Sequence, residues 1–305
     1  MPKEFSSISQ VLETYYATRN QLTRIRQKSA DLRHVVQTAL ERNRKKYDLQ
    51  LRQLKDTESR DKYKVYGELI NTYGYNVAPG EKRLEALNYY TNEIVSIPLD
   101  PVRTPQENAQ RYFAKYNKQK RTFEALTVLC KETAEEIYYL ESVQTALDIA
   151  LTENDLAEIK EELTNSGYIR RRYTKKKVKI NNKPLHYISS DGFHIYVGKN
   201  NLQNDQLTFH FAVGNDWWFH AKQAPGSHVI VRTNGAELPD TTFEEAARLA
   251  AYYSSMRGSD KVEIDYVEKK QVKKPGGGKP GFVVYYTNYS MVIDSNISQI
   301  RLCAD

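Results

Sequence analysis

Residues 112–151 read YFAKYNKQKRTFEALTVLCKETAEEIYYLESVQTALDIAL and decide the fold of the first half of the chain. A stripe of mostly apolar residues runs through this segment at alternating spacings of four and three. This repeat predicts a helix with one buried face, about 60 Å long at 1.5 Å per residue. The stripe comprises Tyr112, Tyr116, Gln119, Phe123, Leu126, Cys130, Thr133, Ile137, Leu140, Gln144, Leu147 and Leu151.

A second long helix is predicted over residues 19–55, which contain neither Gly nor Pro. Two long helices with apolar stripes bury those stripes best against each other, so we expect an antiparallel coiled coil. We assign the stripes no chemistry. The less regular stripe of this helix comprises Leu22, Ile25, Ser29, Leu32, Val36, Leu40, Tyr47 and Leu54.

Residues 56–111, between the two helices, predict a small globular tip with a short helix and a strand-like segment. Thr104, Pro105 and Glu107 form a helix-start signature, with a cap, a first-turn proline and a capping-box acid. A short capped helix over residues 154–167 ends this first domain, which we place at residues 1–167.

Residues 168–305 change to strands and turns, and we expect an α+β domain with a mostly antiparallel sheet and one main helix. Asp191-Gly192 is a hairpin turn signal. The main helix is expected to be capped by Thr242, with Glu245 three residues later. Strands are predicted at 207–214, 216–222, 227–232, 261–270 and 281–293, and the main helix at 241–257.

The composition favours a protein of the cytoplasm. The chain has 305 residues and two cysteines, Cys130 and Cys303, which are too few for a disulfide framework. Its first thirty residues hold no apolar run typical of a signal peptide, and no later run reaches transmembrane length. We therefore expect no membrane insertion.

The charge is concentrated in the second half. Residues 1–167 hold 25 Lys and Arg against 25 Asp and Glu, whereas residues 168–305 hold 20 against 13. Such asymmetry favours a polyanionic partner, RNA or DNA before a membrane, although a solvated basic surface is the alternative. The densest basic run, residues 169–179, contains Arg170, Arg171, Arg172, Lys175 and Lys176.

Residues 214–232, GNDWWFHAKQAPGSHVIVR, combine both tryptophans with two histidines. Alternation along a strand puts Trp217, Phe219 and Ala221 on one face, as core residues. The other face gathers Trp218, His220 and Lys222, to which a hairpin adds His228 and Arg232. Stacking rings beside cations suit RNA. A packed hairpin with structural histidines explains the same pattern, and the residues alone do not decide between them.

Other chemistry is poorly supported here. Two histidines without a nearby cysteine are too few ligands for zinc. Ser227 and His228 are strand neighbours and point in opposite directions, which disfavours a nucleophile and its base. We expect no metal, no cofactor and no enzymatic activity. The sequence therefore disfavours a hydrolase or a metalloenzyme as the class of protein.

Two polar loops complete the candidate site. The segment 197–205, VGKNNLQND, holds Lys199, Asn200, Asn201 and Asp205, whose side chains either brace the backbone or contact phosphate, ribose and bases. The segment 273–280, KKPGGGKP, lacks the ending of a Walker loop but could bring Lys273 and Lys274 to a phosphate.

These segments resemble the NFACT-R domain, and residues 97–121 with the following helix resemble the coiled-coil middle region of the same family. The family motif matches this chain at Asn200, Asn201, Gln203, Asn204, Asp205, Asp216, Trp218, His220, Pro225, Gly226, Ser227 and His228. A usual arginine of the motif is Lys199 here, which keeps the charge and loses the bidentate fork.

The resemblance implies an RNA-binding part of a ribosome quality-control factor. Such proteins bind the large ribosomal subunit, tRNA and rRNA, and support tailing of stalled nascent chains without catalysing peptide transfer. Members of the family also begin with a large N-terminal domain that we do not find, so we expect this chain to be a C-terminal fragment that cannot support tailing alone.

The same resemblance implies an alternative, since Gram-positive members are described as anchorless adhesins that bind fibronectin or fibrinogen. The tyrosine-rich tip and the long arm would suit such contacts, with secondary display at the cell surface. The lack of a signal peptide or wall anchor in the sequence favours the ribosomal function.

Overall fold

The computed structural model describes residues 7–170 and 183–303, apart from the side chains of residues 13, 14, 17, 18, 21 and 22. The chain packs into two compact units. The insert unit is residues 42–136, and the main unit is the rest of the chain. The helices are α1 (Ile8–Lys28), α2 (Ala30–Asp56), α3 (Asp61–Tyr73), α4 (Pro105–Ile149), α5 (Glu153–Asn165), α6 (Asn201–Gln206) and α7 (Asp240–Tyr252).

The long helices confirm most of each stripe, but Leu151 lies beyond the end of α4 and is 42% exposed. The helix predicted over 19–55 is interrupted at Ser29, which lies between α1 and α2. In the main unit, Arg33 of α2 pairs with Asp148 of α4. In the insert unit, Arg60, which follows α2 in the chain, lies over the Phe123 ring of α4.

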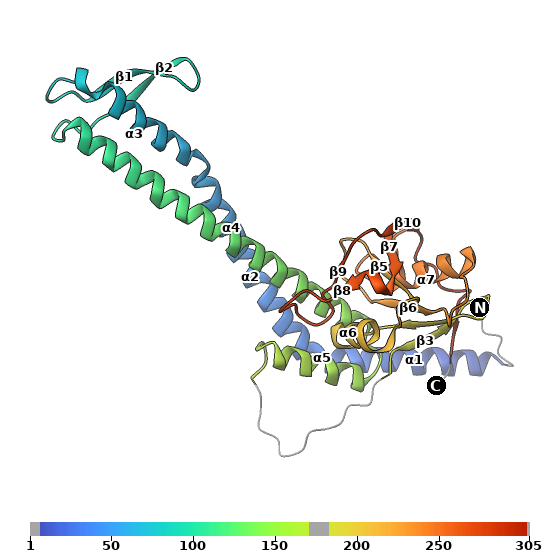
Figure 1. Ribbon diagram of the computed structural model, residues 1–305. Coiled ribbons are helices and arrows are strands. Elements are labelled where there is room, and N and C mark those ends of the chain that lie inside the picture. The colour runs from blue at the N-terminus through green and yellow to red at the C-terminus, as the bar shows by residue number, and fades with distance from the viewer. Residues whose placement is uncertain (1–6, 171–182, 304–305) are drawn as a thin grey trace. The chain divides into compact units, whose positions relative to one another are not determined.

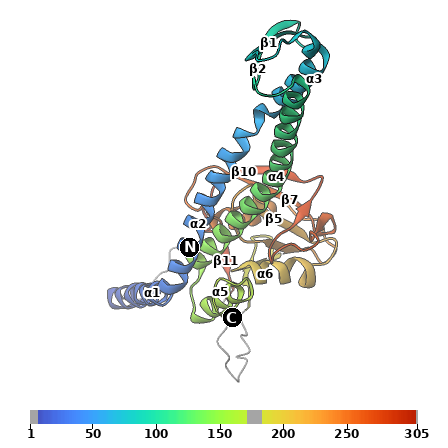
Figure 2. The ribbon, with the colours of Figure 1, turned by 90° about the vertical axis from the view of Figure 1, so that its left-hand side faces the viewer.

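The insert unit confirms the tip, with α3 and an antiparallel hairpin of β1 (Arg83–Asn88) and β2 (Glu93–Pro98). Figures 1 and 2 both show this hairpin beside α3. The capping box at the start of α4 is present, because the Thr104 amide donates to Glu107 at 2.8 Å and the Glu107 amide donates back at 3.2 Å. The centre of the insert unit's core is formed by Leu69, Ile70 and Ile97.

The main unit contains one sheet of seven antiparallel strands in the order β10-β7-β5-β6-β4-β3-β11. Helix α7 packs on one face through its alanine and leucine side chains, as the apolar alternation of the strands requires. A smaller apolar cluster around Trp218 lies on the other face. The strands are β3 (Leu185–Ile188), β4 (His194–Val197), β5 (Trp217–Ala221), β6 (Val229–Arg232), β7 (Val262–Glu268), β10 (Tyr289–Ile293) and β11 (Arg301–Leu302).

Residues 274–283, the glycine-rich loop, connect two short antiparallel strands, β8 (Val272–Lys273) and β9 (Val284–Tyr285). The predicted α+β class is therefore correct, with long helices in the first half of the chain and the antiparallel sheet in the second. The sequence boundary at 167/168 falls inside the main unit, because α5 packs against α6.

Several local predictions are wrong. The strand predicted over 281–293 is two strands, β9 and β10, which belong to different sheets. Residues 207–214 do not form a strand: Leu207–Phe211 is a π-helical segment that continues α6. Thr242 does not cap α7, since Pro239 precedes the helix and the Thr242 hydroxyl donates to Asp191 at 2.8 Å. Within the described residues, we find no helix long and apolar enough to cross a bilayer.

Candidate nucleic-acid interface

The asparagine-rich segment forms helix α6 rather than a loop. Asn200 is its N-cap, and its side chain accepts from the Gln203 amide at 2.9 Å. The Lys199 amide in turn donates to the Gln203 side chain at 3.1 Å. Side chains that favour caps and turns here satisfy the first-turn amides of a short helix.

Most of these polar side chains bind helices α4 and α5. Lys199 pairs with Asp155 of α5 at 2.7 Å, and both side chains are buried. Asn201 donates to Ser142 of α4 and to Glu162 of α5, both at 2.8 Å. This network joins the sheet region to the helices, so Lys199 and Asn201 are not on an open RNA-facing surface. Asn200 and Gln203 likewise donate to Glu158.

Glu162 lies in this network with 1% exposure. Burial raises its pKa to about 7, although hydrogen bonds from Asn201 and Tyr139 act in the opposite direction. The carboxyl group is therefore protonated in part at neutral pH. Lys279 of the glycine-rich loop lies 4.0 Å from the centre of the Tyr139 ring and also favours the charged form of Glu162.

The two histidines of the motif gather around Trp218, as the strand alternation predicted. The Trp218 ring is stacked with His220 at 5.6 Å between centroids, and lies edge-on to His228 at 5.2 Å. However, Trp218 has 0% exposure. Tyr285 of β9 and the apolar cluster cover the ring, so of the two interpretations that the sequence left open, Trp218 fits the packed hairpin and not an accessible stacking surface.

Both imidazoles are neutral at physiological pH. Burial lowers the pKa of His220 to about 4. Burial, and then the neighbouring His220, lower the pKa of His228 well below its usual value. The His228 ring is held by Thr208 at 2.7 Å, and its amide donates to Asn204 at 3.0 Å. Neutral rings offer one donor and one acceptor each.

A pocket of about 210 Å³ opens beside these histidines. Its polar groups are side-chain amides, imidazole nitrogens and tyrosine hydroxyls. Its aromatic walls include Tyr138 and Phe282, whose ring centroids are 5.7 Å apart. Its lining combines a helix of the first half of the chain with the motif segments of the second. The lining residues are Tyr138, Ser142, Asn201, Asn204, His220, Gln223, Gly226, His228, Gly281, Phe282, Val283 and Tyr285.

Local carboxylates pair with three of the predicted cations. Lys222 pairs with Glu263, and Arg232 pairs with the fully buried Asp216 at 3.0 Å. Lys274 pairs with Asp205 at 2.5 Å. These residues therefore serve local ion pairs.

Other members of the predicted site have different environments. Lys273 and Arg170 are exposed, and Ser227 is buried, with its amide bonded to the carbonyl of Tyr253 at 2.9 Å. The basic residues Arg171, Arg172, Lys175 and Lys176 lie outside the described residues. In the part of the chain that the structure describes, no three His, Cys, Asp or Glu side chains gather to hold a metal ion.

The helices supply the residues that sequence reasoning missed. Tyr138, Ser142, Glu158 and Glu162 complete the network and the pocket, although the stripe positions beside them were assigned no chemistry. A weak signal was available, since Glu158 and Glu162 are four residues apart and therefore share one face of α5.

The fold and the site together define a two-part protein, in which paired long helices carry an α+β domain whose polar motif is built against them. Family models agree with this division. The model of the NFACT N-terminal and middle domains matches residues 1–182, and the model of the NFACT protein RNA binding domain matches residues 183–286. The chain belongs to the NFACT family.

The chain is similar to proteins named Rqc2 homolog RqcH. It is 45% identical to that of Streptococcus suis over 283 residues, 92% of this chain and 50% of the relative. Against that of Streptococcus pneumoniae it is 43% identical over 282 residues, 92% of this chain and 51% of the relative. Against that of Bacillus subtilis it is 37% identical over 296 residues, which are 95% of this chain and 51% of the relative. The chain spans about half the length of these curated relatives.

A solved structure is also similar. It is the C-terminal part of the fibronectin/fibrinogen-binding protein from Streptococcus suis, with a TM-score of 0.69 and 39% identity. The match covers 90% of this chain and 96% of the solved one, so the likeness includes both the helical and the sheet regions.

Proposed function

We propose that this chain is the RNA- and ribosome-binding part of a ribosome quality-control factor. In this proposal the chain binds the large ribosomal subunit together with tRNA or rRNA, and the factor of which it is a part supports tailing of stalled nascent chains. It acts by binding and not as an enzyme, and it works in the cytoplasm with the ribosome. The observation that carries the proposal is the match to the family's RNA-binding domain over residues 183–286.

The 210 Å³ pocket supports the proposal chemically. Unpaired RNA bases bind to proteins by stacking on aromatic side chains and by hydrogen bonds to their edges. The pocket offers the Tyr138 and Phe282 rings, the Gln223 amide and the neutral, partly exposed imidazole of His220. These neutral groups can form hydrogen bonds with the donors and acceptors on the edge of an uncharged base. Lys273 and Arg170, both exposed, are the candidates for phosphate contacts.

Sedimentation tests this function. The chain is centrifuged with purified large or small ribosomal subunits at near-physiological salt, and transfer RNA is added as a competitor. The proposal expects pelleting with large subunits that falls as salt rises, because phosphate contacts release counterions. Equal pelleting with both subunits, or none, contradicts it.

A second candidate function is binding of fibronectin or fibrinogen, favoured by the name of the similar Streptococcus suis structure. The same purified chain, assayed on immobilised fibronectin and fibrinogen, separates the two functions. Saturable binding there without ribosome binding would favour the adhesin.

A further inference from the structure

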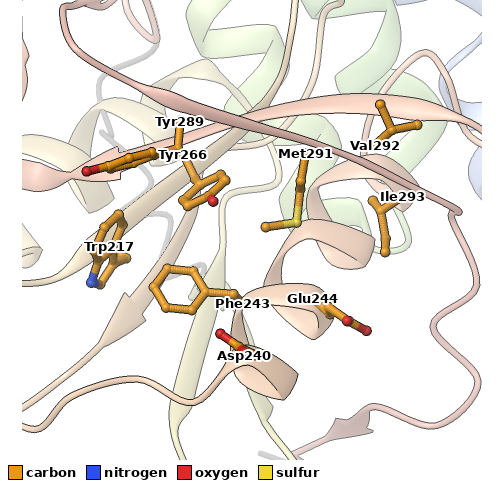
Figure 3. A pocket seen from close by; sticks show the side chains of 9 residues that line it. All are labelled: Trp217, Asp240, Phe243, Glu244, Tyr266, Tyr289, Met291, Val292 and Ile293. Carbon is orange, nitrogen blue, oxygen red and sulfur yellow. The ribbon is translucent and has the colours of Figure 1, made fainter.

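A second hollow lies on the opposite face of the sheet from the polar motif. It is a groove of about 510 Å³ between the start of α7 and the edge strand β10, and Figure 3 shows its side chains. Four of them are aromatic: Trp217 of β5, Tyr266 of β7, Tyr289 of β10 and Phe243 of α7. None of the nine lining residues is a lysine, arginine or histidine.

The aromatic rings form a row that runs out of the core. Phe219, Tyr266 and Tyr289 occupy matching positions on three adjacent strands. Their rings are stacked, with centroids 5.5 Å and 5.6 Å apart. Phe219 is fully buried, whereas Tyr289 is 61% exposed. The row therefore ends on an open ring, which Trp217 flanks at 6.4 Å between centroids, and Phe243 packs against Trp217 and Tyr266 (Figure 3).

Two carboxylates lie in the same groove, on the first turns of α7. Glu244 pairs with Arg248 at 3.3 Å. Asp240 is exposed and makes no ion pair with the residues that the structure describes. Its charge is close enough to Tyr266 to raise the pKa of that phenol, after the larger effects of burial and Tyr289. The groove is thus locally acidic on a protein with a net charge of +7.

We propose that this groove is a docking site for an arginine side chain on an extended segment of a basic partner protein. A guanidinium stacks flat on aromatic rings and pairs with carboxylates, so it matches the combination of Tyr289, Trp217 and Asp240. RNA fits the groove less well, because its phosphates would lie beside Asp240 and Glu244.

Strand β10 also supports the extended form of that partner segment. It ends the order of the seven-stranded sheet, so its outer edge pairs with no other strand among the described residues. A peptide strand added there would form main-chain hydrogen bonds and place alternate side chains on the α7 face. An arginine of the partner would then occupy the matching position beside Tyr289, as the next side chain of the row.

Fluorescence polarisation tests this assignment with the whole chain and a labelled peptide of alternating valine and arginine. A peptide of the same sequence with citrulline in place of arginine removes only the charge. We expect Asp240→Asn and Tyr289→Ala each to weaken binding of the arginine peptide roughly tenfold, and Tyr289→Phe to keep it. The citrulline peptide should bind the wild-type chain at least tenfold more weakly.

Two exposed residues outside the groove provide matched controls, Asp260→Asn and Tyr286→Ala, which should bind as the wild type does. Equal binding of both peptides, or equal losses in the control variants, overturns the proposal. A loss of affinity for single-stranded RNA in Tyr289→Ala but not in Tyr286→Ala would make the groove a base-stacking site instead and also overturns it. The peptide measurement does not depend on ribosome binding.

Discussion

The ammonium of Lys199 lies 2.7 Å from the carboxylate of Asp155, with side-chain exposures of 9% and 1%. This pair joins the segment before α6 to helix α5, and so connects the RNA-binding domain to the helices. The lysine makes this ion pair as a point charge, without the bidentate fork that an arginine would offer.

Removal of one member of this pair should be costly. Lys199→Met leaves Asp155 charged and buried without its partner, and we expect a loss of about 3–5 kcal/mol in the free energy of unfolding. Urea denaturation measures this loss. The control is Lys222→Met, whose pair with Glu263 is more exposed and should contribute about 1 kcal/mol or less. Equal losses in both variants would contradict a structural role for Lys199.

Trp218→Ala should affect stability rather than RNA contact alone. The ring is fully buried, so its truncation leaves a cavity and should cost about 3–5 kcal/mol. Thermal denaturation followed by circular dichroism is the measurement. A variant that keeps the melting temperature and loses RNA affinity would show that the ring is accessible in solution.

Acidification should destabilise the main unit through His220 and His228. Both have lower pKa values in the folded state than the unfolded value of 6.5, so the unfolded state binds more protons as the pH falls. Stability present above pH 6.5 is lost toward pH 4, by up to about 3 kcal/mol for His220 alone. Urea midpoints at pH 7, 5.5 and 4.5 test this. His220→Asn should flatten the decline.

Glu162 should make stability depend on pH in the opposite direction to the two histidines. Its folded pKa of about 7 lies above the usual 4.5, so its contribution is present below pH 4.5 and is lost as the pH rises through 7. Glu162→Gln keeps the acceptor for Asn201 without the buried charge. The change in the free energy of unfolding caused by Glu162→Gln should be more favourable at pH 8 than at pH 5, by up to about 3 kcal/mol. A gain that does not vary with pH would refute the raised pKa.

Lys273, an exposed lysine at the end of β8, should contribute to RNA affinity through a phosphate contact. Lys273→Gln is expected to weaken binding and to reduce the slope of log affinity against log salt by about 1. Lys118→Gln, an exposed lysine of the insert unit, is the charge-matched control for binding to a short RNA. An unchanged slope would remove Lys273 from the interface.

The long-range pattern of the fold was predictable, because heptad and strand periodicity report which face of each element is buried. Ile25, Leu40 and Leu140 are buried as their stripes require. Residues 207–211 were misassigned because alternation in a short aromatic segment does not distinguish a strand from a helix that packs on both sides.

The site was harder to predict for a physical reason. Periodicity showed that Trp218, His220 and His228 would cluster, but the sequence contains no signal for what covers them. Their burial depends on contacts with Tyr285 and with helix α4, which are distant in sequence. The same holds for Lys199, because a cation that pairs with a distant aspartate has the same sequence signature as one that binds phosphate.

The most direct test of the account is whether the 210 Å³ pocket contacts RNA. Gln223 lines the pocket, is exposed and has a φ of 52°, so Gln223→Gly removes its amide without backbone strain. Asn234→Gly, at an exposed φ of 50° outside the pocket, is the matched control. The measurement is fluorescence anisotropy of a labelled single-stranded RNA titrated with each variant. The account predicts a roughly fivefold loss of affinity for Gln223→Gly and none for Asn234→Gly. Identical affinities for both variants and the wild type would contradict it.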